Sequence, residues 1–117
     1  MSTFSKQDVV TRCLRDLSLI SAEEAPSPDD LAFGIETLES VFDQLSAESI
    51  QFWNTSSGSV ARPYLVALSK RLALDVGPAF GLGTIAEAEA AKQAANFALR
   101  QIGPKAPTGA VQQGGYF

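Results

Sequence analysis

Apolar residues recur at intervals of three and four in four separate stretches of this chain, and each stretch is bounded by Gly, Pro or small polar residues. That spacing is typical of helices that bury one face. We find no convincing strand pattern and no internal repeat. At 117 residues the chain has the length of one domain. The sequence therefore predicts an all-α fold, a small four-helix bundle over residues 1–102.

Local signals predict where the first two helices begin. Ser5 is the expected N-cap of the first helix, with Asp8 in its first turn, and Val9, Cys13 and Leu17 lie on its apolar face. The second helix has the clearest start, because Ser27 caps it and Pro28 occupies its first position. Its apolar stripe consists of Leu31, Ile35, Leu38, Phe42 and Leu45.

The third and fourth helices have equally local boundaries. We expect the third to start near Arg62-Pro63 and to stop at Gly77-Pro78, with Gly77 as a left-handed cap. Thr84 and Glu87 fit a capping box at the start of the fourth, which runs to about Gln101. Between the second and third helices, Trp53 is expected to anchor a polar loop to the core.

The last fifteen residues, 103–117, cannot continue a helix because they contain four Gly and two Pro. They also differ from a typical charged tail, since they carry one charge and end in two aromatic rings. We predict an extended C-terminal arm that binds a partner, the alternative being a tail with no role. The residues expected to contact this partner or a neighbouring subunit are Pro104, Lys105, Pro107, Val111, Tyr116 and Phe117.

Charge is distributed unevenly along the chain. The net charge is −4 overall, but residues 1–50 contain ten acids and three bases, whereas residues 51–117 contain six bases and three acids. The two halves can pair within one subunit, which is the simpler interpretation, or between neighbours. For pairing between subunits we expect the acids Glu36, Glu39 and Asp43 and the bases Lys70, Arg71 and Arg100.

Catalytic and cofactor-binding patterns are missing from the sequence. There is no His and only one Cys, Cys13, so zinc and iron–sulfur sites are not expected. The glycines at 77, 81 and 83 lack the Lys and preceding strand of a phosphate-binding loop. We therefore predict no enzyme activity, metal or cofactor. A membrane span and a dedicated nucleic-acid site are also not expected, because long apolar runs are missing and the net charge is negative.

The order of segments resembles a known family. A short helix over residues 5–17, an acidic loop, a longer helix containing Leu31 and Leu45, the cluster Ile50-Gln51-Phe52-Trp53, two further helices and a non-helical arm follow in turn. This layout is similar to that of the head–tail connector adaptors of tailed bacteriophages, in particular the tail accessory factors beneath the portal of short-tailed phages. The resemblance covers nearly the whole chain but contains no short diagnostic motif.

The resemblance implies a structural role in the virion. Such adaptors are made in the host cytoplasm and form a ring, usually of twelve subunits, at the head–tail junction. They join the portal protein to the tail tube or nozzle, and packaged DNA passes through their channel without specific binding. The arm would grip the portal. The alternative is a soluble helical interaction module that is not part of a virion.

Overall fold

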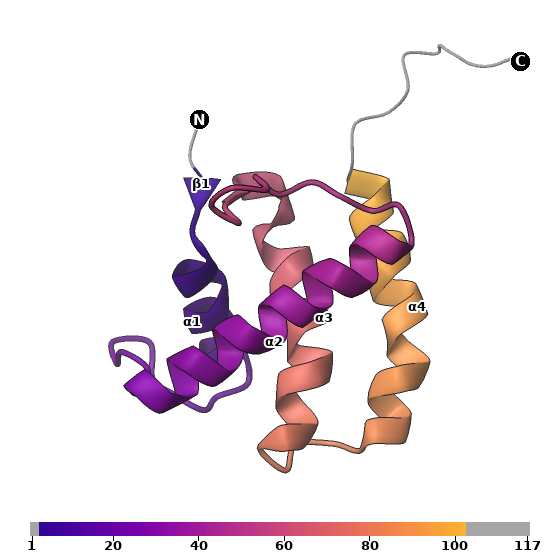
Figure 1. Ribbon diagram of the computed structural model, residues 1–117. Coiled ribbons are helices and arrows are strands. Elements are labelled where there is room, and N and C mark those ends of the chain that lie inside the picture. Colours follow the sequence, from indigo (N-terminus) through magenta and orange to yellow (C-terminus); the bar gives the residue numbers. More distant parts are fainter. Residues whose placement is uncertain (1–2, 103–117) are drawn as a thin grey trace, which may run out of the picture.

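The computed structural model describes residues 3–102, and Figure 1 shows their arrangement. The predicted arm, residues 103–117 with all six of its proposed contact residues, lies outside the described residues. The elements in chain order are β1 (Thr3–Phe4), α1 (Lys6–Asp16), α2 (Pro28–Ala47), β2 (Val60–Ala61), the short 3₁₀ helix η1 (Arg62–Tyr64), α3 (Leu65–Ala79) and α4 (Ile85–Ile102). The predicted all-α class and its four helices are confirmed.

Three helix starts follow the predicted local chemistry. The Ser5 hydroxyl accepts from the backbone N–H of Asp8, whose carboxylate accepts from the backbone N–H of Ser5 in return. At α2 the Ser27 hydroxyl accepts from the backbone N–H of Asp30, and Pro28 is the first residue of the helix. At α4, Thr84 and Glu87 form the second reciprocal pair. These caps satisfy N–H groups that have no partner within the helix.

The predicted boundaries of the third helix are wrong at both ends. Arg62-Pro63 begins η1 rather than an α-helix, and α3 continues through Gly77 and Pro78 to Ala79. Pro78 is tolerated because it lies in the last turn, where it removes a single hydrogen bond. The carbonyl of Gly77 accepts from Phe80 and Leu82, and the left-handed glycine that follows the helix is Gly81, with φ of 80°.

A short antiparallel ribbon also went unpredicted. Thr3 faces Ala61 and Phe4 faces Val60, so the segment before α1 pairs with the segment before η1. Two residues per strand are too few to show an alternating pattern. The ribbon closes one end of the body.

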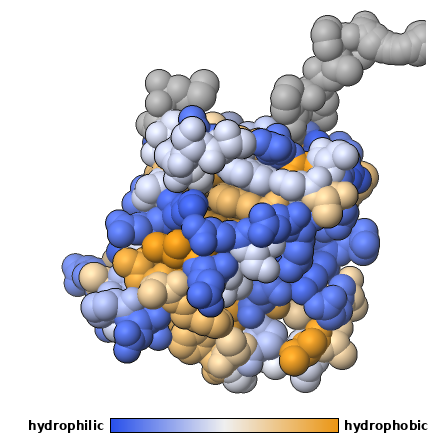
Figure 2. All heavy atoms as spheres, in the orientation of Figure 1, coloured by the Kyte–Doolittle hydropathy of each residue, from blue (hydrophilic) through white to orange (hydrophobic). Residues whose placement is uncertain are grey.

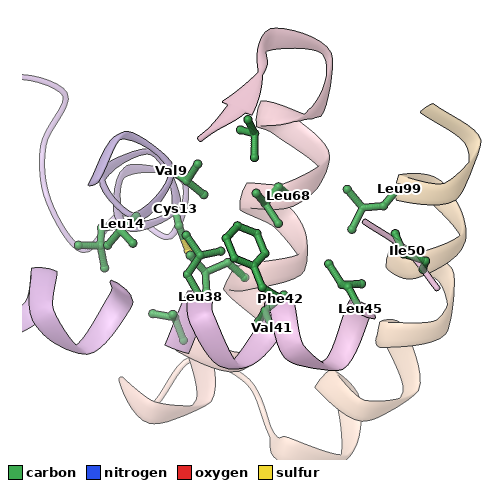
Figure 3. Close-up of a cluster of buried hydrophobic side chains, with 14 residues drawn as sticks. Val9, Cys13, Leu14, Leu38, Val41, Phe42, Leu45, Ile50, Leu68 and Leu99 are labelled. Atoms are coloured by element: carbon green, nitrogen blue, oxygen red, sulfur yellow. The ribbon is translucent and has the colours of Figure 1, made fainter. Parts of the chain in front are cut away.

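Helix α3 is the central element. It contacts α1, α2 and α4, and Figure 1 shows α1 and α4 on its two sides with α2 crossing in front. The apolar core lies mainly among α1, α2 and α3, where Val9, Cys13, Leu38 and Leu68 have no exposed surface. Figure 3 shows this cluster with Leu99, its only member from α4 among the described residues.

The loop after α2 is held by stacked rings. Trp53 stacks on Phe42 at 4.1 Å between ring centroids, and Phe52 stacks on Tyr64 at 4.3 Å. An edge-to-face contact between Phe52 and Trp53 joins the two pairs. The expectation that Trp53 anchors this loop is confirmed, and the rings connect α2 to η1.

Candidate interaction surfaces

The predicted charged residues occupy different environments. Glu39 forms an ion pair with Lys6 of α1 at 2.7 Å, so it is paired inside the subunit. Arg100 is exposed, and its guanidinium donates to the backbone carbonyl of Glu48 at 3.0 Å. Glu36, Asp43 and Lys70 are also exposed, and none of the three forms an ion pair within residues 3–102.

The prediction for Arg71 requires a correction, because this side chain is buried inside the subunit, with 1% of its surface exposed. Its Nε donates to Asn96 Oδ1 at 2.9 Å, Nη1 to Asp75 Oδ2 at 2.8 Å and Nη2 to Gln44 Oε1 at 2.7 Å. The guanidinium therefore connects α2, α3 and α4 and is not available to a neighbouring subunit. A buried cation with these three partners is compensated, as burial demands.

This polar network continues on both sides of Arg71. Asn96 donates to the Glu48 carboxylate at 3.0 Å, and Lys92 Nζ lies 3.0 Å from Asp75. Lys92 also pairs with Glu89. Burial by itself lowers the pKa of the Lys92 ammonium, but its hydrogen bonds and charge attraction to Glu89 and Asp75 outweigh that effect and raise the pKa. The network ties α4 to the rest of the body largely through polar contacts.

The side of α2 that faces solvent is strongly acidic. Seven of its exposed residues define what we call the α2 outer face: Asp29, Ala32, Glu36, Glu39, Ser40, Asp43 and Ala47. No Lys or Arg lies on α2. Figure 2 shows hydrophilic residues over much of the surface along this helix. Lys70, by contrast, belongs to α3. It is exposed on the side of α3 that does not pack against α1, α2 or α4.

The solvent side of α4 is rich in alanine. Its exposed residues define the α4 outer face: Ala86, Glu87, Glu89, Ala90, Gln93, Ala94, Phe97, Ala98, Arg100 and Gln101. Unlike the α2 outer face it carries charges of both signs, and Phe97 leaves 59% of its surface exposed. The exposure of Phe97 was not predicted from the sequence. The signal was available, because Ala88 and Leu99 are three helical turns apart and place Phe97 on the other side of the helix.

Open grooves flank the junction of α3 and α4, and the two larger ones differ in polarity. One, of about 320 Å³, has an apolar floor that includes Leu74, Pro78, Ile85 and Ala88. The other, of about 340 Å³, is polar and is lined by Gln44, Glu48, Glu89 and Asn96 among others. Both lie beside the network around Arg71, and its groups are already paired with one another.

The described residues offer little for catalysis. They contain no group of three or more metal-ligating side chains. Burial, and to a lesser degree the charge of Asp16, raises the pKa of the Cys13 thiol to about 12, so it is not an activated nucleophile. Within residues 3–102, no helix is both long and apolar enough to cross a membrane.

Comparison with known proteins adds no relative. No protein-family model matches the chain, and no curated protein or solved structure is significantly similar to it.

Proposed function

We propose that this chain is a structural adaptor of a phage particle, which forms a ring that joins the portal protein to the tail and continues the DNA channel. The proposal follows from the resemblance of the segment order, and the four-helix body is compatible with it. As with the related adaptors, the ring would hold twelve subunits at the head–tail junction of the virion. DNA would pass through the channel without specific binding.

The observation that carries the proposal is an acidic face on α2 together with an exposed lysine on a different side of the same small body. A head-to-tail ring requires each subunit to offer two different, complementary faces. The α2 outer face supplies Glu36 and Asp43, whereas Lys70 lies on the uncovered side of α3. These three groups have no ion pair inside the described body, so their charges remain available to a neighbour. Arg71 is excluded from this contact by its burial, and Glu39 already pairs with Lys6.

The arm supplies the second part of the proposal. Residues 103–117 follow α4 directly, and their composition differs from that of the body in having one charge and two terminal aromatic rings. In the proposed adaptor this segment grips the portal, and the body contacts the tail tube or nozzle. A peptide groove that accepts Tyr116 and Phe117 is the expected form of the portal site.

Binding to portal rings of the phage that encodes the chain tests the role of the arm. The full chain is expected to sediment with the portal rings, whereas a variant that lacks residues 103–117 should keep its helical circular dichroism and fail to sediment with them. The double variant Tyr116→Ala and Phe117→Ala is expected to lose most of the binding. Unchanged binding of the truncated chain would disprove the arm's role.

Charge reversal tests the ring contact separately. With portal rings present, Glu36→Lys combined with Asp43→Lys should reduce the number of bound subunits, because like charges would face Lys70. Adding Lys70→Glu should restore it. Glu23→Lys combined with Glu24→Lys is the matched control, since both acids are exposed in the loop before α2. If the control is as harmful as the α2 variant, total charge and not the α2 outer face is responsible.

A second function is supported by the α2 outer face alone. An exposed acidic helix surface without bases is suitable for docking a basic peptide, so the alternative is a soluble helical interaction module outside any virion. Failure of the full chain to bind portal rings, together with tight binding of basic peptides, would favour this alternative.

A further inference from the structure

We propose that the apolar groove between α3 and α4 binds the C-terminal segment of the same chain, residues 103–117, and holds the rings of Tyr116 and Phe117. This contact closes within one copy and needs no portal protein, so it goes beyond the proposed adaptor role. The segment lies outside the described residues, whereas every wall residue of the groove is described.

The groove is an open apolar hollow at the start of α4. Its volume is about 320 Å³, and Leu74 and Pro78 of α3 and Ile85 and Ala88 of α4 form its floor. Ile85 leaves 71% of its surface exposed, and Leu82, in the loop just before α4, leaves 41%. Apolar side chains that gather around one hollow, and are not scattered singly, are typical of a binding site.

The hollow exists because α4 contributes small side chains at this end. Four of its first seven residues are alanines, and Ala88 is the one that is buried against α3. The α4 side chain that enters the apolar core, Leu99, is three helical turns away. Leu74 and Pro78 are therefore only half-buried here. Two aromatic rings would cover them and supply the missing volume.

The groove is within reach of residues 103–117 of the same chain. It extends along α4 from Lys92 to Ile85, so it lies about 15–26 Å from Ile102 at 1.5 Å per residue. An extended chain covers about 3.3 Å per residue, so residues 103–110 are long enough to pass along the whole groove. A tether of this length keeps the rings near the groove at an effective concentration on the order of mM, which favours the same chain over a second copy.

The order of residues in the segment agrees with this path. Gly103 and Pro104 are turn-forming residues, which suits a reversal of direction directly after α4. Residues 103–110 contain no large apolar side chain, whereas the seven residues that follow include Val111, Tyr116 and Phe117. The apolar side chains therefore begin at the distance from Ile102 at which the groove lies.

Charge around the groove favours an uncharged occupant. Lys92 at the rim pairs with both Asp75 and Glu89, so the three charged groups are already engaged with one another. A charged ligand would have to compete with these pairs, whereas aromatic rings would leave them in place. Residues 106–117 carry no charged side chain.

Cysteine pairs test the docking directly. Gly115→Cys is next to the rings and leaves both of them intact, and Ala79→Cys lies in the wall of the groove. Under mild oxidation at micromolar protein concentration, this pair is expected to form a disulfide within one chain, detected by its mobility on a non-reducing gel. Native Cys13 is buried and does not interfere.

Gly115→Cys with Val66→Cys is the matched control. Val66 is exposed at the start of α3, beside the C-terminal end of α4, so random motion of the segment would reach it at least as readily as Ala79 (Figure 1). We expect the Ala79→Cys pair to close about tenfold faster. Equal rates would overturn the proposal. Disulfide-linked dimers in place of the closed monomer would also overturn it, because the segment of a second copy would then fill the groove.

Carboxypeptidase digestion tests the docking without new cysteines. Release of Phe117 requires the segment to leave the groove, so its rate follows the population of undocked chains. Ile85→Glu suits the first turn of α4 but should speed the release by about fivefold or more, because an unpaired charge is costly in an apolar hollow. Val66→Glu is the matched control and should not change the rate. Equal release from Ile85→Glu and the natural chain would overturn the proposal.

The docked segment also has a consequence for the adaptor, and this consequence rests on the proposed function. The same two rings cannot occupy the groove and a portal site at once, so portal protein would have to draw them out of the groove. Neither experiment contains portal protein, so a failure of the docking is distinguishable from a failure of the adaptor role.

Discussion

Helices α2 and α4 both pack against α3, but they are held there by different interactions. From α2, the side chains of Leu38, Val41, Phe42 and Leu45 enter the common apolar core. From α4, the core receives Leu99 only, and the rest of the attachment depends on Ala88 and on the polar contacts of Asn96 and Lys92. The outer faces also differ, since that of α2 carries acids and no base, whereas that of α4 is rich in alanine and carries charges of both signs.

The apolar attachment of α2 and the polar attachment of α4 are expected to have different roles, the first in the stability of the fold and the second in the orientation of a helix. Buried apolar area stabilises a contact without strong dependence on direction. Buried hydrogen bonds contribute less on average but fail when their geometry changes. We therefore expect α2 to account for more of the free energy of unfolding, and the network around Arg71 to fix how α4 lies against α3. The predictions below follow from this comparison, in order of decreasing effect.

Truncation of a core side chain on α2 should have the largest effect. Leu45 has no exposed surface, so Leu45→Ala is expected to lower the free energy of unfolding by about 2–5 kcal/mol through lost burial and a cavity. Urea denaturation measures this value. A loss below about 1 kcal/mol would show that α2 is not attached by its apolar face.

Removal of the Arg71 guanidinium should cost somewhat less. Arg71→Met keeps much of the volume but removes the donor to Asn96 Oδ1 and leaves Lys92 as the remaining partner of Asp75, so we expect a loss of about 2–3 kcal/mol. Arg71→Lys is the matched control that keeps the charge but cannot reach three partners, and its loss should be intermediate. If Arg71→Met were as stable as the natural chain, the network around Arg71 would not be what holds α4 against α3.

High pH should destabilise the core around α1, α2 and α3. The pKa of Cys13 is raised from 9.0 to about 12, so the folded chain keeps its proton while the unfolded chain loses it. Stability contributed by the neutral thiol is therefore complete below pH 9 and decreases toward pH 12, by about 1.4 kcal/mol per pH unit. Denaturation midpoints measured from pH 8 to 11 should fall. In Cys13→Ala the part of this decline that is due to the thiol should disappear.

A methyl group at Gly34 tests how closely α1 and α2 approach. A Cβ at this position would collide with Val10 Cγ1, so Gly34→Ala is expected to cost about 1 kcal/mol even though Ala favours a helix more than Gly. Combining it with Val10→Ala should produce a smaller loss than the sum of the two single changes. Additive losses would show that the two positions are not in contact.

Neutralisation of the α2 outer face should have the smallest effect on stability. Glu36→Gln and Asp43→Asn remove exposed charges that have no ion pair in the described residues, so the change should stay within about 0.5 kcal/mol. Urea denaturation of both variants checks this. A larger loss would indicate that these acids have a structural role inside the subunit.

The helix starts were predictable because each depends on a few adjacent residues. Ser5 with Asp8, Ser27 with Pro28, and Thr84 with Glu87 satisfy local N–H groups wherever the helices later pack. The β1–β2 ribbon was not predictable, because Phe4 and Val60 are distant in sequence and each strand is two residues long. The continuation of α3 through Pro78 was not predictable either, because the helix end is formed by hydrogen bonds from the backbone N–H groups of Phe80 and Leu82 to the carbonyl of Gly77.

The amino-acid sequence by itself determined that this chain forms four helices and where most of them begin, because helix formation and capping depend on neighbours within one turn. Only the tertiary structure decided which side of each helix is covered. That arrangement buried Arg71, paired Glu39 with Lys6 and left Phe97 exposed. The exposure of a side chain depends on the crossing of distant helices, and no local pattern of residues fixes that crossing.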